Sequence, residues 1–180
     1  NDGIGNPKNA KSMLFAHRTP PAMSMGIRES AETAVRAGFR YIQFAAQTEE
    51  VATAVDAYLK SLRPVPSPRL EGGRLSAAAQ RGKRVFADEA VGCADCHSGR
   101  DFTDLHSHVV GSENAREPRE TRFDTPTLVE LWRTAPYLHD GSAPTVRELF
   151  TTRNTQNRHG NTTHLSPTQI DDLVAYLLSL

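Results

Sequence analysis

The sequence has little that would place the chain in a membrane or on a nucleic acid. Its 180 residues contain no run of about 18 apolar residues, which excludes a transmembrane helix. Its 21 basic and 21 acidic side chains cancel, so no overall field favours nucleic acid or an anionic bilayer. It opens with neither an initiator methionine nor the basic and apolar stretches of a signal peptide. We expect a processed or truncated piece of a longer protein, large enough for one ordinary domain or two small ones.

Cysteine is equally scarce, because both thiols of the chain lie in GCADCHSGR, from Gly92 to Arg100. Three interpretations of this motif compete. A zinc site needs four ligands, so two cysteines and one histidine would require another histidine. A thioredoxin-like redox pair would begin a helix in a βαβ unit, and strand-like patterning is scarce here. Covalent haem attachment is the interpretation we favour. Cys93 and Cys96 would reach both vinyl groups from one helical turn, and the adjacent His97 would bind the iron.

Two amphipathic helices flank this motif, as a cytochrome c fold requires. The first, in LSAAAQRGKRVFADEA, has Ser76 as its expected N-cap, and Gly82 inside it predicts a close helix crossing. The second, in SPTQIDDLVAYLLSL, has Ser166 as its expected N-cap and Pro167 in its first turn. One apolar stripe at helical spacing is formed by Ile170, Leu173, Val174, Leu177 and Leu178.

The chain contains an internal repeat. HRTPPAMSMG (17–26) matches WRTAPYLHDG (132–141), and AVDAYLKSL (54–62) matches DLVAYLLSL (172–180). The repeat predicts an all-α fold with two cytochrome c-like lobes in tandem. We expect the lobes at 1–62 and 75–180, joined by the proline- and glycine-rich linker 63–74.

The first lobe is expected to be incomplete at its N-terminus. The second lobe carries its C-x-x-C-H motif 36 residues before Arg133, and the equivalent position before Arg18 falls upstream of Asn1. Either a longer parent carries a first haem motif, or the first lobe is a haem-free buttress. We favour the longer parent.

FDTPTLVELWRTAPYLHDGSAPTVREL (123–149) resembles the C-terminal lobe of the bacterial di-haem cytochrome c peroxidase family. That superfamily includes the di-haem enzyme that matures the tryptophan tryptophylquinone cofactor of methylamine dehydrogenase. The segment 5–39 resembles a subgroup in which the di-haem module follows a β-propeller. The resemblance implies one covalent haem c in this chain, a second haem in the parent, and a calcium ion between the haems.

The family's calcium ligands correspond to the asparagine Asn9 and to Thr134 and Pro136 of the TAP segment. Hard hydroxyl and carbonyl oxygens suit calcium. The alternative for Asn9 is that it caps a helix at NAKS. The resemblance also gives His108, in the segment after the haem motif, a structural role rather than ligation.

The sixth iron ligand is harder to assign. The position where family peroxidases often carry a methionine is Arg153 here, which cannot bind iron. The repeat aligns His159 with Tyr41, so we expect His159 to be the distal ligand of the haem on His97. His164 is the main competitor, followed by His139.

Other residues receive roles from the same resemblance. Tyr41 would face the missing haem, and Tyr41 and His139 are the candidate catalytic residues. Arg133 and Arg18 could pair with haem propionates. Trp132, the single tryptophan, is either an electron relay between haem centres or a packing residue.

Coordination separates the function hypotheses. Protein ligands on both faces of the iron leave electron transfer, whereas an open face permits peroxide reduction with an acid-base group nearby. We expect an electron-transfer module of a peroxidase-like oxidoreductase, without robust peroxidase activity in the isolated chain. The alternatives are a peroxide-reducing enzyme when the parent is complete, or a docking module beside a propeller. The expected partner is a small redox protein or another haem, and thioether attachment implies a periplasmic or extracytoplasmic location.

Overall fold

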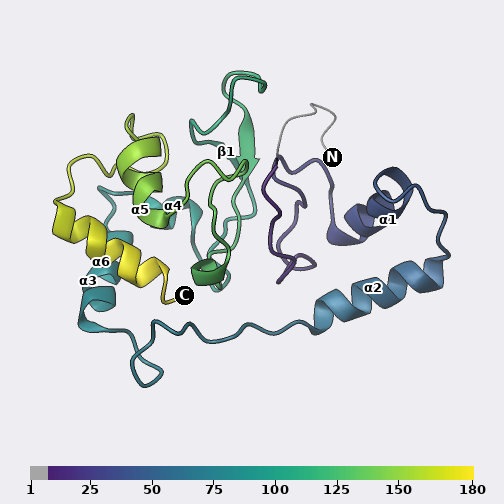
Figure 1. Cartoon of the computed structure of the whole chain (residues 1–180), viewed down its shortest axis with the longest axis horizontal. Coiled ribbons are helices and arrows are strands. Elements are labelled where there is room, and N and C mark those ends of the chain that lie inside the picture. Colours follow the sequence, from purple (N-terminus) through teal and green to yellow (C-terminus); the bar gives the residue numbers. More distant parts are fainter. Residues whose placement is uncertain (1–7) are drawn as a thin grey trace.

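The computed structural model describes residues 8–180, and the first seven residues of the expected first lobe lie outside it. The described part is rich in helix and has one short sheet (Figure 1). None of its helices has the length and apolar character needed to cross a bilayer. The elements are α1 (Ala31–Tyr41), α2 (Glu49–Ser61), α3 (Ala77–Phe86), α4 (Cys93–Cys96), β1 (Ser107–Val109), β2 (Arg122–Asp124), the 3-10 turn η1 (Leu131–Arg133), α5 (Val146–Glu148), the π turn η2 (Leu149–Arg153) and α6 (Pro167–Leu177).

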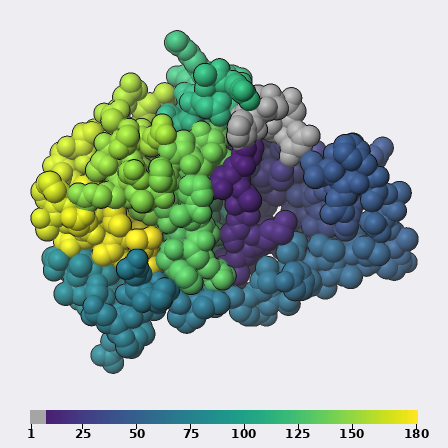
Figure 2. Space-filling view, viewed as in Figure 1, coloured from purple at the N-terminus to yellow at the C-terminus, as the bar shows by residue number. Residues whose placement is uncertain are grey.

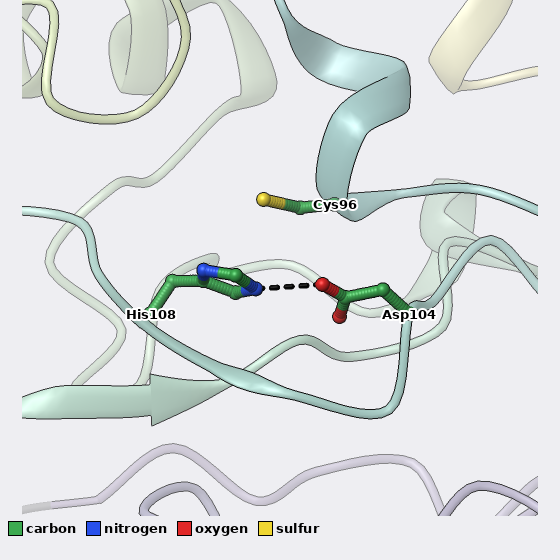
Figure 3. A group of neighbouring side chains, drawn as sticks. All are labelled: Cys96, Asp104 and His108. Atoms are coloured by element: carbon green, nitrogen blue, oxygen red, sulfur yellow. Dashed lines mark hydrogen bonds and ion pairs between the residues drawn. The ribbon is translucent and has the colours of Figure 1, made fainter.

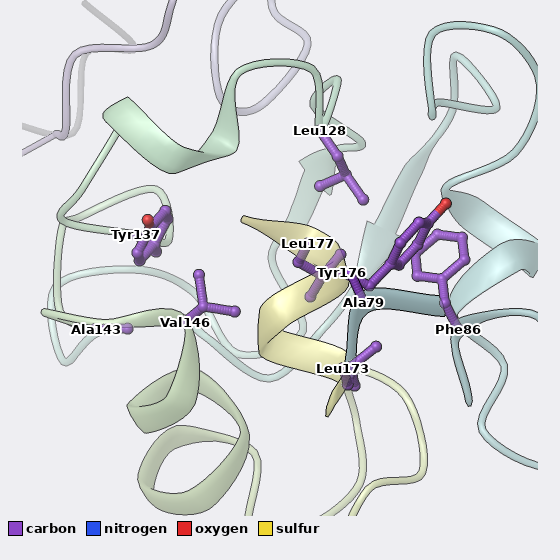
Figure 4. Packing of buried hydrophobic residues seen from close by; sticks show 9 residues of the cluster. All are labelled: Ala79, Phe86, Leu128, Tyr137, Ala143, Val146, Leu173, Tyr176 and Leu177. Atoms are coloured by element: carbon purple, nitrogen blue, oxygen red, sulfur yellow. The ribbon is translucent and has the colours of Figure 1, made fainter. Parts of the chain in front are cut away.

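The two helices expected around the cysteine motif are α3 and α6, and they pack against each other. Ser76 caps α3 by accepting from the backbone N–H of Ala79. Ser166 and Gln169 form a reciprocal capping box at the start of α6. The predicted caps are therefore confirmed. The apolar cluster under this crossing contains Ala79, Phe86, Leu128, Tyr137, Ala143, Val146, Leu173, Tyr176 and Leu177 (Figure 4).

The helix α3 is shorter than its sequence pattern suggested. It ends at Phe86, whereas the alanine- and charge-rich pattern continues to Ala90. Asp88 stops it, because its side chain accepts from the N–H of Ala90 and its carbonyl accepts from Val91 and Gly92. The turn made in this way brings the chain round to the cysteines.

A two-stranded antiparallel sheet is the departure from an all-α fold. β1 and β2 pair Ser107 with Asp124, His108 with Phe123 and Val109 with Arg122. Strands of three residues carry too few positions for an alternating pattern to be recognised in a sequence. The sheet lies beside the N-terminal segment (residues 8–30) in Figure 1.

The repeated sequence segments adopt the same local turn. Each contains one cis peptide bond, Pro20–Pro21 in the first segment and Ala135–Pro136 in the second. Met23 and Leu138 then take left-handed backbone conformations, with φ of 76° and 68°. The turns are closed by isolated bridges that pair Ala22 with Arg28 and Tyr137 with Ala143.

The N-terminal segment lies between the α1–α2 pair and the C-terminal half of the chain (Figures 1 and 2). Several polar contacts join it to the C-terminal half. Lys11 pairs with the buried Asp124 at 2.6 Å, and the backbone oxygen of Ser24 accepts from the N–H of Asp124 at 2.9 Å. Arg18 pairs with Asp101.

The α1–α2 pair is held by a polar network of its own. The buried Asp56 on α2 contacts His17 at 2.9 Å and Arg36 of α1 at 2.5 Å. Arg36 also pairs with Glu49 at the start of α2.

The expected linker 63–74 is tied to the C-terminal half. The N–H of Val65 donates to the buried Glu130 at 2.5 Å, and the Ser67 hydroxyl donates to the Leu178 carbonyl at 2.6 Å. A tight turn follows at Gly72 and Gly73, with φ of 57° and 76° and open space where side chains would stand.

Candidate haem centre

The cysteine motif forms the single turn α4. Gly92 precedes it in a left-handed conformation with φ of 76°, a backbone that glycine adopts without strain. Both thiols are free of disulfide and only partly exposed. Burial and the neighbouring Asp95 raise the pKa of Cys93 to about 11, and burial also raises the pKa of Cys96. A thioredoxin-like pair typically has a lowered thiol pKa, which is the opposite direction.

Cys96 has two further possible metal ligands beside it. Its sulfur and the side chains of Asp104 and His108 form the group in Figure 3, with all three ligand atoms within 4.8 Å of one another. His108 contacts Asp104 at 2.6 Å. Within residues 8–180 no group of three or more such ligands includes Cys93. A zinc site built on both cysteines therefore has no support in the geometry.

His97 follows α4 directly and its imidazole is held from one side. The ring Nδ1 lies 3.0 Å from the carbonyl oxygen of Phe102. A carbonyl only accepts, so Nδ1 carries the proton and Nε2 is left with its lone pair. Burial lowers the pKa of His97 and favours the neutral ring. Metal-binding histidines typically have such a tautomer, fixed by a backbone carbonyl.

The imidazole of His159 lies close to that of His97. The two ring centroids are 6.3 Å apart and the ring planes differ by 27°. Burial, followed by the proximity of His97, lowers the pKa of His159 to about 4, so its ring is neutral at neutral pH. Its Nδ1 is buried and has no hydrogen-bond partner among residues 8–180.

The separation of these rings fits one metal between them. Metal–imidazole bonds of about 2.0–2.1 Å place the centres of two opposed rings roughly 6 Å apart. Two neutral, enclosed imidazoles are also the form that coordinates iron. Together with two thiols on one turn, the pair fits a covalent haem with histidine on both faces.

The loop carrying His159 packs against the cysteine turn. The N–H of Asn161 donates to the Val91 carbonyl at 2.9 Å. A Cβ placed on Gly160 would lie 3.2 Å from that carbonyl and 3.9 Å from the sulfur of Cys93. The thiols, His97 and His159 therefore converge, although His159 is 62 residues beyond His97 in the sequence.

The competing histidines lie elsewhere. His164 is exposed, and its side chain makes no hydrogen bond with another described residue. His139 is enclosed and contacts the buried Glu117 at 2.8 Å, with its ring 4.0 Å from that of Phe123. Arg153, at the family's methionine position, donates to a backbone carbonyl.

Trp132 and Arg133 lie together on η1. The indole N–H of Trp132 is buried and has no partner within the described chain. The guanidinium of Arg133 is paired with the buried Glu130, with Nε at 2.8 Å. Tyr41, at the end of α1, is 51% exposed and its ring lies beside Arg40.

Two of the three expected calcium ligands meet. The side-chain Nδ2 of Asn9 donates to the carbonyl oxygen of Pro136 at 2.5 Å, and its backbone N–H donates to the His139 carbonyl at 2.7 Å. The hydroxyl of Thr134 is used within its own turn, where it donates to Leu131. Residues 8–13 form no helix, so the alternative that Asn9 caps a helix is wrong.

Sequence reasoning missed three residues around this centre. The Phe102 carbonyl gives no sequence signal, because any residue can supply it. The Glu117 side chain is fully buried against His139, and nothing in the sequence singles it out. Asn154 binds the backbone around His159, and the loop composition TRNTQNRHG hinted at this only through its two asparagines.

Comparisons with known proteins point to a cytochrome c-like chain. Residues 123–159 match a family described as RoxA-like, cytochrome c-like. Hydrazine synthase subunit gamma of Kuenenia stuttgartiensis is 28% identical over 99% of this chain and 66% of its own length. The methylamine utilization protein MauG of Methylophilus methylotrophus is 31% identical over 59% of this chain and 37% of its own length.

Solved structures agree as well. A structure of Kuenenia stuttgartiensis hydrazine synthase superposes with a TM-score of 0.86 at 25% identity, over 100% of this chain and 74% of that one. The diheme peroxidase BthA from Burkholderia thailandensis matches with a TM-score of 0.71 at 16% identity, over 100% and 73%. The latter likeness shows the fold alone.

The fold and the match over residues 123–159 support a cytochrome c-like module that binds haem c. The chain is similar to the RoxA-like, cytochrome c-like family over residues 123–159 and to the methylamine utilization protein MauG over part of its length. It spans just under two thirds of its hydrazine synthase relative and well under half of its MauG relative.

Proposed function

We propose that this chain carries electrons through one haem c, attached to Cys93 and Cys96 and bound by His97 and His159. The observation that carries this proposal is the 6.3 Å separation of two enclosed imidazoles beside a thiol pair. When bound, the haem supplies one-electron chemistry at its iron. Thioether attachment takes place outside the cytoplasm, which supports a periplasmic or extracytoplasmic location.

The residues of the chain determine what such a haem can do. His97 and His159 are both neutral, so both could hold the haem iron without first losing a proton. A centre closed on both faces leaves no site for peroxide and favours electron transfer. Histidine on both faces also lowers the reduction potential relative to a histidine–methionine pair.

The test is an absorption spectrum of the oxidised and reduced haem protein, with and without peroxide. The intact protein should be six-coordinate and low-spin in both states and should not respond to peroxide. His159→Ala should open one face and produce a high-spin spectrum. His164→Ala, in an exposed histidine a few residues away, is the matched control and should leave the spectrum unchanged. A low-spin spectrum that persists in His159→Ala would overturn the assignment.

Trp132 and Arg133 support a cofactor-facing role for η1. An enclosed indole N–H without a partner is costly, and an acceptor such as a haem propionate would remove the cost. Arg133 already has its partner in Glu130, so its pairing with a propionate would require exchange of that partner.

The α1–α2 region supports an incomplete first lobe. Tyr58 of α2 matches Tyr176 of α6 in the repeat, but Tyr58 is 65% exposed whereas Tyr176 is 5% exposed and packs on Phe86. An open hollow beside α1 is lined by Arg36, Phe39, Arg40, Phe44, Gln47 and Ala52. We propose that residues 8–62 belong to a first lobe that holds a second haem in the parent, joined by 63–74 to the lobe at 75–180.

A peroxide-reducing parent is the second candidate function. In that parent the second haem would be the open one, with Tyr41 nearest to it and His139 near the contact between the lobes. The present chain would then supply electrons, taken from a small redox protein or another haem. A calcium ion bound by Asn9, Pro136 and Thr134 would lie between the lobes, and a β-propeller upstream completes the proposed parent.

A further inference from the structure

We propose that Asn154 is the residue that positions His159 as an iron ligand. This inference rests on the proposed function, because it gives Asn154 a role only if His159 binds the haem. It adds a residue that acts through the ligand and touches neither the haem nor the thiols.

Asn154 binds the peptide groups on both sides of His159. Its side-chain Oδ1 accepts from the N–H of His159 at 2.9 Å. Its Nδ2 lies 3.0 Å from the His159 carbonyl, 2.7 Å from the Gly160 carbonyl and 3.0 Å from the Thr162 hydroxyl. Asn154 itself is only 4% exposed. Fixing both peptide groups fixes the direction in which the His159 side chain leaves the backbone.

The two proposed ligands are held in different ways. The ring of His97 is anchored through Nδ1 by the Phe102 carbonyl. The ring of His159 has no such anchor in the described part of the chain, where its Nδ1 is buried without a partner. The orientation of His159 therefore depends on its backbone, and the backbone depends on Asn154.

The chemistry of the site requires asparagine. The loop from 154 to 163 belongs to no helix or strand, so its peptide groups need partners outside a regular ladder. A side-chain amide supplies an acceptor and two donors at once. Aspartate would keep the acceptor for His159 but lose both donors, and serine would be too short. The N–H of Asn154 donates to Leu149 at 3.0 Å, which fixes its own position at the end of η2.

The test uses the haem-loaded protein and compares Asn154→Ser and Asn154→Asp with Gln156→Ser. Gln156 is an exposed amide in the same loop whose side chain makes no hydrogen bond with another described residue, so it is the matched control. Loss of a partner that orients a metal ligand typically weakens ligation about 10- to 100-fold. We expect the ferric haem of Asn154→Ser to bind cyanide, and its ferrous haem to bind carbon monoxide, more tightly by that factor. The ligand affinities of Asn154→Asp should lie between those of Asn154→Ser and those of the unmutated protein. The affinities of Gln156→Ser should equal those of the unmutated protein.

The outcomes distinguish this inference from the proposed function. A high-spin His159→Ala together with unchanged exogenous-ligand binding in Asn154→Ser would overturn the role of Asn154 alone. A low-spin His159→Ala would overturn the ligand assignment and this inference with it. If neither Asn154 variant folds, amide hydrogen exchange of the unmutated protein with reduced haem tests the role of Asn154. The His159 amide should then be among the most protected in residues 154–163, and rapid exchange there would refute the proposal.

Discussion

The carbonyl oxygen of Asp172 lies 1.8 Å from the point where a Cβ on Gly82 would stand. The helices α3 and α6 therefore cross backbone against backbone, and no side chain separates them at this point. The atom that blocks the position belongs to the main chain of α6, which cannot rotate away as a flexible side chain would.

Gly82→Ala should destabilise the protein strongly. Overpacking usually lowers the free energy of unfolding by about 1–3 kcal/mol. Because the obstacle is a main-chain atom, the loss in Gly82→Ala should be about 3 kcal/mol or more. The matched control is Gly38→Ala in α1, where a Cβ would meet nothing within 4 Å. That variant should gain about 0.5–1 kcal/mol from the better helix propensity of alanine. Denaturant unfolding of both variants checks the prediction, and equal stability would contradict it.

Acid should weaken the same crossing. Arg81 donates two hydrogen bonds to Asp172, at 2.6 and 2.7 Å, and these bonds lower the pKa of Asp172 below its ordinary value of 3.8. The folded chain therefore binds this proton less readily than the unfolded chain. The stabilisation is complete above about pH 4 and is lost as the pH falls through the lowered pKa.

Thermal melts at pH 7 and pH 3 test this prediction. The melting temperature of the unmutated protein should fall between pH 7 and pH 3. It should fall by less in Asp172→Asn, which has no carboxylate at position 172 to protonate. Other carboxylates titrate in both proteins, so the difference between the two falls isolates Asp172. Equal falls would show that the ion pair does not contribute.

The haem should be held by two covalent bonds. Acidified butanone extracts haem that is not covalently attached. After this treatment the haem should remain on the unmutated protein and on each single variant, Cys93→Ala and Cys96→Ala. The double variant should release it. Mass spectrometry of the intact chain checks the result through the added mass of one haem, and release from the parent would show that the thiols are not bonded to it.

Calcium removal should lower the thermal stability if Asn9 and Pro136 share an ion. A ligand present at a hundred times its dissociation constant stabilises by about 2.7 kcal/mol. The melting temperature should therefore drop when a chelator is added and recover with calcium. Asn9→Ala should remove this response, and Asn161→Ala, an exposed asparagine on another loop, should keep it. A chelator response in Asn9→Ala equal to that of the parent would exclude Asn9 as a ligand.

Much of the fold around α3 and α6 could be predicted, because its determinants are local. Ser76 and Ser166 cap helices through their own side chains, and Gly82 is costly in a helix unless a close crossing compensates. The repeat around residues 17–26 and 132–141 was visible because the same turn requires the same residues.

The remaining features depend on distant parts of the chain. The sheet of β1 and β2 consists of strands too short to show a period. The role of Asn154 is set by tertiary position, because asparagine in a polar loop ordinarily marks a turn. His159 was chosen among three histidines by alignment with Tyr41. Its ring centroid lies 6.3 Å from that of His97, and its role as a ligand stays a prediction.

The Gly72–Gly73 turn is a suitable position for inserting a tag into this chain. The turn is exposed, its neighbours leave open space around both glycines, and the hydrogen bonds of Val65 and Ser67 hold the preceding backbone in place. A fluorescent tag or an affinity peptide inserted there should be tolerated. The site thereby offers a handle for attaching the protein to an electrode without disturbing its thiols.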